Sequence, residues 1–153
     1  MNAADKRSVS GVRIRRMEEG DAEEVNELVS QLGYPNDLGK TATAIRAVLG
    51  SESGDAFVAV DSEGHVVGWA HVFVAPHIES GPNAELGGLV VDEDARGEGA
   101  GRMLVERVEA WARERGASEI TLRSNIVRDG AHKFYQHLGF EVQKTQHKFR
   151  KKL

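Results

Sequence analysis

Apolar residues along the chain recur with two periods, and changes of period divide the sequence into strands and helices. Alternation is typical of half-buried strands, and spacing by three and four residues is typical of amphipathic helices. The predicted strands are 12–15, 57–60, 65–75, 84–91, 118–123 and 140–149. The predicted helices run from residue 21 to 32, from 44 to 49, from 99 to 115 and from 131 to 138. The order β-α-α-β-β-β-α-β-α-β predicts a mixed α/β (α+β) domain.

Capping and turn residues set the boundaries of these elements. Asp21 followed by Glu24 has the spacing of a helix N-cap with a carboxylate three residues on. The polar stretch 61–64 contains a glycine and predicts a hairpin between 57–60 and 65–75. The stretch 76–82 begins and ends with proline, so we expect a loop there.

Two adjacent glycines, Gly87 and Gly88, interrupt the apolar strand 84–91. Glycine inside a strand weakens it, and it usually marks a bulge or a place where the backbone comes close to another group. We therefore expect an irregularity in the middle of this strand.

Composition and charge exclude several classes of protein. The 153 residues suit one domain, and we expect a disordered lead over 1–10 followed by a single domain over 11–153. The absence of cysteine excludes a disulfide scaffold, a cysteine nucleophile and thiolate metal sites, and it fits a cytoplasmic location. No apolar run reaches the ~20 residues of a membrane span, so neither a membrane anchor nor a signal peptide is expected. A net charge of −4 disfavours binding to nucleic acid.

The segment between 92 and 101 is the most informative for chemistry. An apolar strand ends, an acidic turn follows, and Gly97, Gly99 and Gly101 lead into a helix. Glycines let backbone N–H groups converge, and the first turn of a helix offers further unpaired N–H groups, so an anion such as pyrophosphate suits this place. The Walker and dinucleotide-binding patterns are both missing. The alternative is a glycine-rich turn that only lets the strand and helix pack closely.

Two motifs give the chain a family resemblance. Arg96-x-x-Gly99-x-Gly101, after a Leu-Val-Val strand, resembles the acyl-CoA pyrophosphate loop of the GNAT N-acetyltransferase superfamily. Asn125, followed by the segment 131–140 with its Ala-x-x-Phe-Tyr-x-x-x-Gly-Phe pattern, is similar to a later motif of the same family. The resemblance covers about residues 12–150. It implies a central mixed, mostly antiparallel sheet with a splayed pair of parallel strands and flanking helices.

The resemblance also implies a binding site for acetyl-CoA. In this family the co-substrate lies between the two splayed strands, here 84–91 and 118–123. Its pantetheine arm pairs with the first strand, and its pyrophosphate binds the loop amides. The residues that the resemblance assigns to acetyl-CoA binding are Leu89, Val90, Val91, Arg96, Gly97, Glu98, Gly99, Ala100, Gly101, Arg102, Asn125, Ala131 and Phe134.

Two residues match positions that move protons in the family. Tyr135 matches the acid that protonates the departing CoA thiolate, and its phenol keeps its proton at neutral pH. It also falls on the apolar stripe of the helix 131–138, so a packed core tyrosine is the alternative. Glu85 matches a base that acts directly or through water, and a strand-end carboxylate in solvent is its alternative. Direct attack by the amine is expected because no cysteine can hold the acetyl group.

The acceptor is the least determined feature of the sequence. We expect the primary amine of a small molecule, and segments near both ends of 124–153 look similar to aminoalkylphosphonate acetyltransferases. A peptide or protein N-terminus, a lysine side chain, or a noncatalytic acyl-CoA sensor are the alternatives. His65, His71 and His77 share strand parity and could line an acceptor pocket, although a half-exposed sheet surface is favoured. No metal site is expected, and a homodimer is possible.

Overall fold

The computed structural model describes residues 11–34, 37–124 and 127–153, and the chain forms two compact units. The first unit extends to Leu122 and the second begins at Arg123. The expected lead, residues 1–10, lies outside the described residues. The prediction of one domain over 11–153 stays a prediction.

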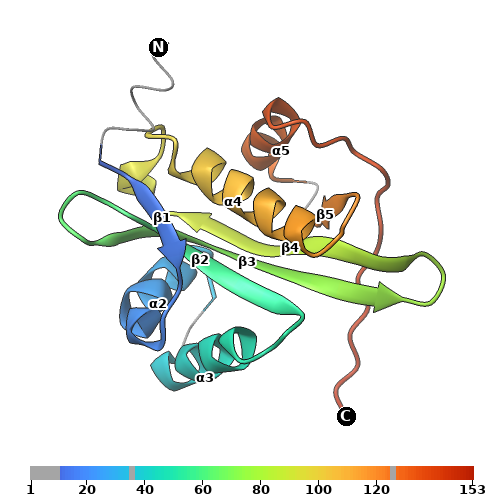
Figure 1. Cartoon of the computed structure of the whole chain (residues 1–153), viewed down its shortest axis with the longest axis horizontal. Helices are drawn as coiled ribbons and strands as arrows, with labels where there is room; N and C mark the ends of the chain where they lie inside the picture. Colours follow the sequence, from blue (N-terminus) through green and yellow to red (C-terminus); the bar gives the residue numbers. More distant parts are fainter. Residues whose placement is uncertain (1–10, 35–36, 125–126) are drawn as a thin grey trace. The chain divides into compact units, whose positions relative to one another are not determined.

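The first unit is built on a five-stranded sheet in the order β1-β2-β3-β4-β5 (Figure 1). The strands are β1 (Arg13–Arg16), β2 (Gly54–Val60), β3 (Val66–His77), β4 (Gly81–Val91) and β5 (Ile120–Leu122). Neighbours are antiparallel except β4 and β5, which are parallel. The helices are α2 (Ala22–Ser30), α3 (Leu38–Leu49) and α4 (Ala100–Glu114), with short 3-10 turns at η1 (Glu19–Asp21) and η2 (Glu93–Ala95). The predicted fold class is confirmed.

The two faces of the sheet pack against different helices, as Figure 1 shows: α2 and α3 cover one face and α4 covers the other. Side chains alternate between the faces along each strand. Ala56, Val58 and Val60 join the core cluster that includes residues of α2 and α3. Phe57 points the opposite way, and the guanidinium of Arg107 on α4 lies 4.5 Å from its ring centroid. Buried apolar residues on both faces hold this unit together.

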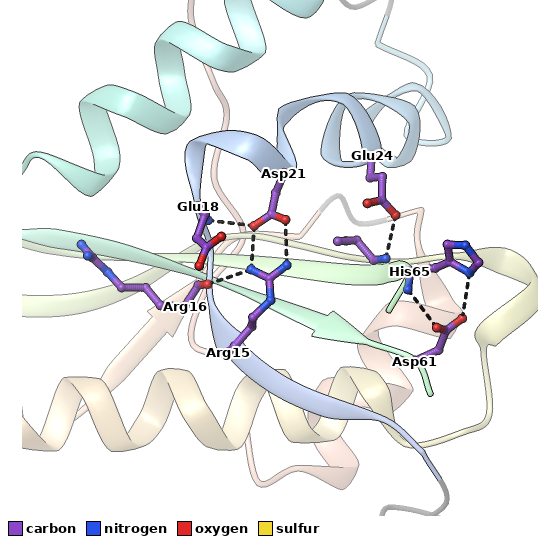
Figure 2. A network of polar contacts seen from close by, with 8 residues as sticks. Arg15, Arg16, Glu18, Asp21, Glu24, Asp61 and His65 are labelled. Carbon is purple, nitrogen blue, oxygen red and sulfur yellow. Dashed lines mark hydrogen bonds and ion pairs between the residues drawn. The ribbon is translucent and has the colours of Figure 1, made fainter. Parts of the chain in front are cut away.

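Asp21 is the N-cap residue of α2, as predicted, but its side chain makes no capping hydrogen bond to the helix. The carboxylate instead accepts two hydrogen bonds of 2.8 Å from the guanidinium of Arg15 and one from the Glu18 amide (Figure 2). Burial would raise the pKa of Asp21, but these hydrogen bonds outweigh it and hold the pKa below its ordinary value. The bidentate pair fastens β1 to the start of α2. Glu24 likewise binds the Val66 amide at 2.8 Å, which ties α2 to β3.

The expected loop over 76–82 is wrong in its bounds, because β3 and β4 extend into it as a hairpin and leave only the turn 78–80. Pro76 lies opposite Pro82, and His77 lies opposite Gly81. Proline has no backbone N–H, and because the two prolines lie opposite each other, both missing donors belong to one residue pair of the antiparallel sheet. Such a pair can lie at a position where the two residues exchange no hydrogen bonds. Gly81 has a φ of +77°, which suits the tight turn.

In the second unit, α5 (Asp129–His137) confirms the predicted helix, which is followed by Gly139 with a φ of +93°. The predicted strand 140–149 is wrong, since this segment has no regular secondary structure. Val142 and Phe149 are 73% and 91% exposed. Alternating residues are not sufficient for a strand, because a strand also needs a partner for its N–H and C=O groups.

Candidate acyl-transfer site

A bulge interrupts β4 where the glycine pair predicted an irregularity. His71 of β3 lies opposite Gly88, and the next residue, Val72, lies opposite Leu86, so Gly87 is the extra residue. The space beside both glycines is filled. A Cβ on Gly87 would lie 2.8 Å from the ring of Phe73, and one on Gly88 would lie 2.9 Å from the ring of Trp69. Glycine is therefore required here for the close approach of aromatic rings as well as for the bulge.

The parallel pairing of β4 with β5 stops at the same place. It covers Ala84 to Leu86, opposite Ile120 to Leu122, and ends one residue before the bulge. From Gly87 to Val91, the edge of β4 that faces away from β3 has no pairing with β5. This agrees with the predicted splayed pair, and it leaves a strand edge to which an extended group could add as another strand.

At the end of β4 the chain forms the predicted glycine-rich loop. Gly97 and Gly99 have φ values of +87° and +88°, and a Cβ on either would meet nothing within 4 Å. Gly99 is the N-cap of α4, and its carbonyl accepts the first helical hydrogen bond, from Met103 at 3.0 Å. The amides of residues 100–102 precede this bond, so they belong to the unpaired first turn of the helix. This arrangement can bind an anion.

The other residues predicted to bind acetyl-CoA in this unit differ in exposure. Arg96 and Glu98 are exposed, and Leu89 and Val91 are half-buried. Val90 is 4% exposed and belongs to the core cluster under α2, so only its backbone could serve a ligand. Arg102 forms an ion pair of 3.1 Å with Glu106 one turn along α4.

Glu85 is buried, with 8% of its surface exposed, which overturns the alternative of a strand-end carboxylate in solvent. It lies on β4 opposite Phe73 and two residues before the bulge. Residues directly opposite each other share a face of the sheet, so Glu85 lies on the same face as Phe73 and His71. This is the face that α2 and α3 cover. A carboxylate in this setting can accept a proton from a bound amine.

A cavity of about 350 Å³ lies on this face, between the sheet and the helices α2 and α3. Its wall is mostly apolar, with Lys40, Thr41 and His71 as polar members and Trp69 as its aromatic member. His71 is half-buried, and its ring centroid lies 5.4 Å from that of Phe73. Burial lowers the pKa of His71, so the imidazole is neutral at pH 7.

The three histidines thus have different settings. His71 lines the cavity, whereas His65 lies exposed in the turn before β3 and His77 lies at the far end of that strand. Sequence parity could not separate them. The part played by Trp69 was missed altogether: its backbone lies opposite Val90, but its ring extends beside Gly88, and a glycine pair within a strand is a signal that a bulky neighbour lies close.

Asp61, Glu63 and His65 also come together, with potential ligand atoms within 4.8 Å of one another. Asp61 accepts hydrogen bonds of 2.9 Å from the amides of Glu63 and His65. The cluster is therefore the hydrogen-bonded turn of the β2–β3 hairpin, whose Asp61–His65 contact Figure 2 shows.

The second unit contains the remaining predicted site residues. Tyr135 is half-buried on α5, and its ring contacts Phe134 and Phe140 with centroid distances of 5.3 and 5.8 Å. Burial raises the pKa of Tyr135, and the charge of Arg128 opposes this only in part. The phenol therefore keeps its proton at neutral pH. Ala131 is half-buried on the same helix, and Asn125 lies outside the described residues.

Comparison with known proteins identifies the family. The model of the Acetyltransferase (GNAT) family matches residues 22–140. An aminoglycoside N(6')-acetyltransferase type 1 of Stenotrophomonas maltophilia is 30% identical over 115 residues, which cover 72% of this chain and 75% of that protein. A structure described as a transcriptional regulator from Bacillus halodurans aligns with a TM-score of 0.81 and 26% identity, covering 91% of this chain and 99% of that one.

A third match adds a ligand-bound example. An aminoglycoside N-acetyltransferase solved in complex with CoA aligns with a TM-score of 0.82 and 23% identity, over 93% of this chain and 95% of that one. At this identity the likeness concerns the fold. Among the helices of the described residues, none is long and apolar enough to cross a membrane. Because the family model covers more than half of the sequence, the chain belongs to the GNAT family and is, as predicted, an acetyl-CoA-dependent N-acetyltransferase.

Proposed function

We propose that this protein transfers the acetyl group of acetyl-CoA to the primary amine of a small molecule, by direct attack within a ternary complex. The observation on which the proposal rests is the combination along β4. A buried carboxylate, Glu85, lies just before the bulge, a stretch of strand edge that does not pair with β5 follows, and the glycine-rich loop lies beyond the strand's end. A base, a strand edge for an extended arm and a place for an anion therefore follow one another along one strand.

The proposal assigns acetyl-CoA binding to backbone groups. The pyrophosphate would bind the amides of the loop 97–101, and the pantetheine arm would pair with β4 at Leu89 and Val91. An amide near the bulge would polarise the thioester carbonyl and stabilise the negative charge that develops on its oxygen. In the second unit Asn125, Ala131 and Phe134 are proposed to contribute further contacts.

Two side chains are proposed to move the protons of the reaction. Glu85 takes a proton from the ammonium group of the acceptor, directly or through water, and the free amine attacks the thioester carbon. The C–N bond forms, the C–S bond breaks, and Tyr135 protonates the departing thiolate. The attacking nitrogen loses its second proton, which restores the phenol of Tyr135 directly or through water. The raised pKa of Tyr135 keeps this proton available at neutral pH. The relative in Stenotrophomonas, named for a small-molecule substrate, supports a small amine as the acceptor.

Turnover assays with Tyr135→Phe test the proposal against a noncatalytic acyl-CoA sensor. The wild-type protein should release CoA from acetyl-CoA only when an amine is present. The variant keeps the ring and its packing but loses the donor, so turnover should fall about 10²–10⁴-fold. Stabilisation by CoA should change little, because backbone amides provide that binding. Normal turnover in the variant would remove Tyr135 from the mechanism, and CoA binding without turnover of any amine would favour the sensor.

Two broader features stay predictions. We propose a cytoplasmic location, which fits a chain without cysteine. A homodimer is proposed as well, and light scattering on the purified protein over a range of concentrations measures its mass directly.

A further inference from the structure

The cavity under α2 and α3 has the size and wall of a small-molecule pocket. Its volume of about 350 Å³ falls in the range of ligand sites, roughly 300–1,000 Å³, and mostly apolar walls are usual for them. The aromatic ring of Trp69 and the aliphatic side chains of α2 and α3 form most of the wall. Such a wall favours an apolar or aromatic group over a highly hydrated one.

The charges around the cavity disfavour a polycation. Among the described residues that line it, none is acidic, and Lys40 is basic. Its histidine, His71, is neutral at pH 7 because burial lowers its pKa. A ligand with several ammonium groups would lose water around each charge, meet no carboxylate in this wall, and be repelled by Lys40.

On this face of the sheet the cavity ends at His71, one position before Phe73 and the proposed base. His71 lines the cavity, and Phe73 is the next residue of β3 on the same face. Glu85 lies directly opposite Phe73 on β4, so it occupies the neighbouring position of this face. A ligand whose body fills the cavity would therefore bring one amine to Glu85 on an extension that passes Phe73.

We infer that the acceptor is an arylalkylamine, a compound with one primary amine and an uncharged aromatic body that occupies this cavity. The inference rests on the proposed function and goes beyond it by naming the class of acceptor. It also separates this chain from the relatives that are named for aminoglycosides, which carry several amines.

A panel of three acceptors tests the class. Tyramine represents the arylalkylamines, kanamycin the aminoglycosides, and 2-aminoethylphosphonate the small anionic amines. The value of kcat/KM for tyramine should exceed that of the other two by about tenfold or more, the scale on which an apolar pocket discriminates. A larger kcat/KM for kanamycin or for the phosphonate would overturn the inference and leave the proposed function in place.

A pair of variants on α3 locates the binding. Ala44 and Ala47 are both exposed, but Ala44 lines the cavity and Ala47 does not. Ala44→Phe should fill the mouth of the cavity and raise the KM for tyramine about tenfold, with an unchanged KM for acetyl-CoA. Ala47→Phe places the same ring on the same helix outside the cavity, and it should leave both constants unchanged. Equal effects of the two variants on tyramine would overturn the location.

A binding measurement that requires no turnover distinguishes the proposed acceptor pocket from the proposed acetyl transfer. The chain has two tryptophans, Trp69 in the cavity wall and Trp111 on α4. Tyramine fluoresces at similar wavelengths, so cyclohexylethylamine, whose ring is also apolar, serves as the probe for tryptophan emission. It should change the emission of the wild type and not that of Trp69→Phe or Ala44→Phe. If no amine is acetylated but this binding is seen, the proposed function fails and the pocket stands. If turnover occurs and the emission does not change, the pocket assignment fails.

Discussion

Two glycine sites, the pair 87–88 inside β4 and the pair 97 and 99 in the loop that follows this strand, use the same residue for opposite reasons. At the first site neighbouring rings occupy the space beside the backbone, and a Cβ would lie within 3.0 Å of Trp69, His71 or Phe73. At the second site the space is empty, and glycine is needed because φ is positive. Crowding indicates packing, whereas open space at a positive φ is shared with ordinary turn glycines such as Gly64, and it leaves room for a ligand only where the neighbouring amides can bind one.

The difference separates a glycine required by neighbouring side chains from a glycine required by its backbone conformation. The pair at the bulge fixes where β4 departs from regular pairing, and it thereby fixes where Glu85 lies relative to Phe73 and His71. The loop pair leaves the backbone amides accessible and gives no side chain a place to pack. We therefore expect proton transfer by Glu85 beside the glycine pair 87–88, and binding of the co-substrate at the loop glycines 97 and 99. Variants of the two sites should have opposite phenotypes.

The largest effect is expected from Glu85→Gln, beside the crowded site. Turnover should fall about 10²–10⁴-fold, because the variant cannot take the proton of the amine. The defect should be greatest at low pH and partly rescued as the pH rises, since the acceptor then loses its proton to the solvent. Initial rates across pH measure this, each acceptor being compared with itself. A variant with the wild-type pH profile would return Glu85 to a structural role. Stabilisation by CoA should be retained.

The second effect belongs to the open site. CoA at 100 times its dissociation constant should stabilise the fold by about 2.7 kcal/mol, and Gly99→Asp or Gly101→Asp should remove this gain by placing a negative charge where the pyrophosphate binds. Gly64→Asp is the matched control for Gly99→Asp, because Gly64 has the same φ of +88° and the same open surroundings in the β2–β3 turn. Thermal unfolding with and without CoA should show the gain in the control and not in the loop variants. Equal gains in all three would place the pyrophosphate elsewhere.

Patterns with a local physical cause were predictable from the sequence, and those that depend on a partner were not. The bulge, the loop and the helix α4 follow from glycine positions and helical spacing, which act within a few residues. The rings that crowd Gly87 and Gly88 come from β3, and their identity depends on register. Asp21 fits a capping pattern and an ion pair equally well, and the position of Arg15 decides between them. The segment 140–149 alternates like a strand, but its residues after Phe140 are exposed.

The third prediction tests whether the ring of Trp69 leaves room for a side chain at position 88. Gly88→Ala should lower the free energy of unfolding by about 1–3 kcal/mol, the usual cost of overpacking, because the new methyl group meets the ring of Trp69 at 2.9 Å. In the double variant Gly88→Ala/Trp69→Phe the smaller ring should relieve part of this cost. Denaturant unfolding of the four proteins of this cycle gives the coupling between the two positions. Additive effects would show that Gly88 is needed for its backbone alone.

The smallest effect is a pH dependence that originates at the crowded site. Burial lowers the pKa of His71, whose ring lies against Gly87. Below the ordinary histidine pKa of about 6.5 the unfolded chain binds a proton that the folded chain resists, so stability falls as the pH decreases toward the pKa of the folded state. His71→Gln removes the titrating group and leaves the other histidines unchanged. Between pH 7 and pH 5 the wild type should therefore lose more unfolding free energy than this variant. Parallel curves for the two proteins would mean that His71 takes up its proton as readily in the folded protein as in the unfolded chain, and that the space beside Gly87 admits water.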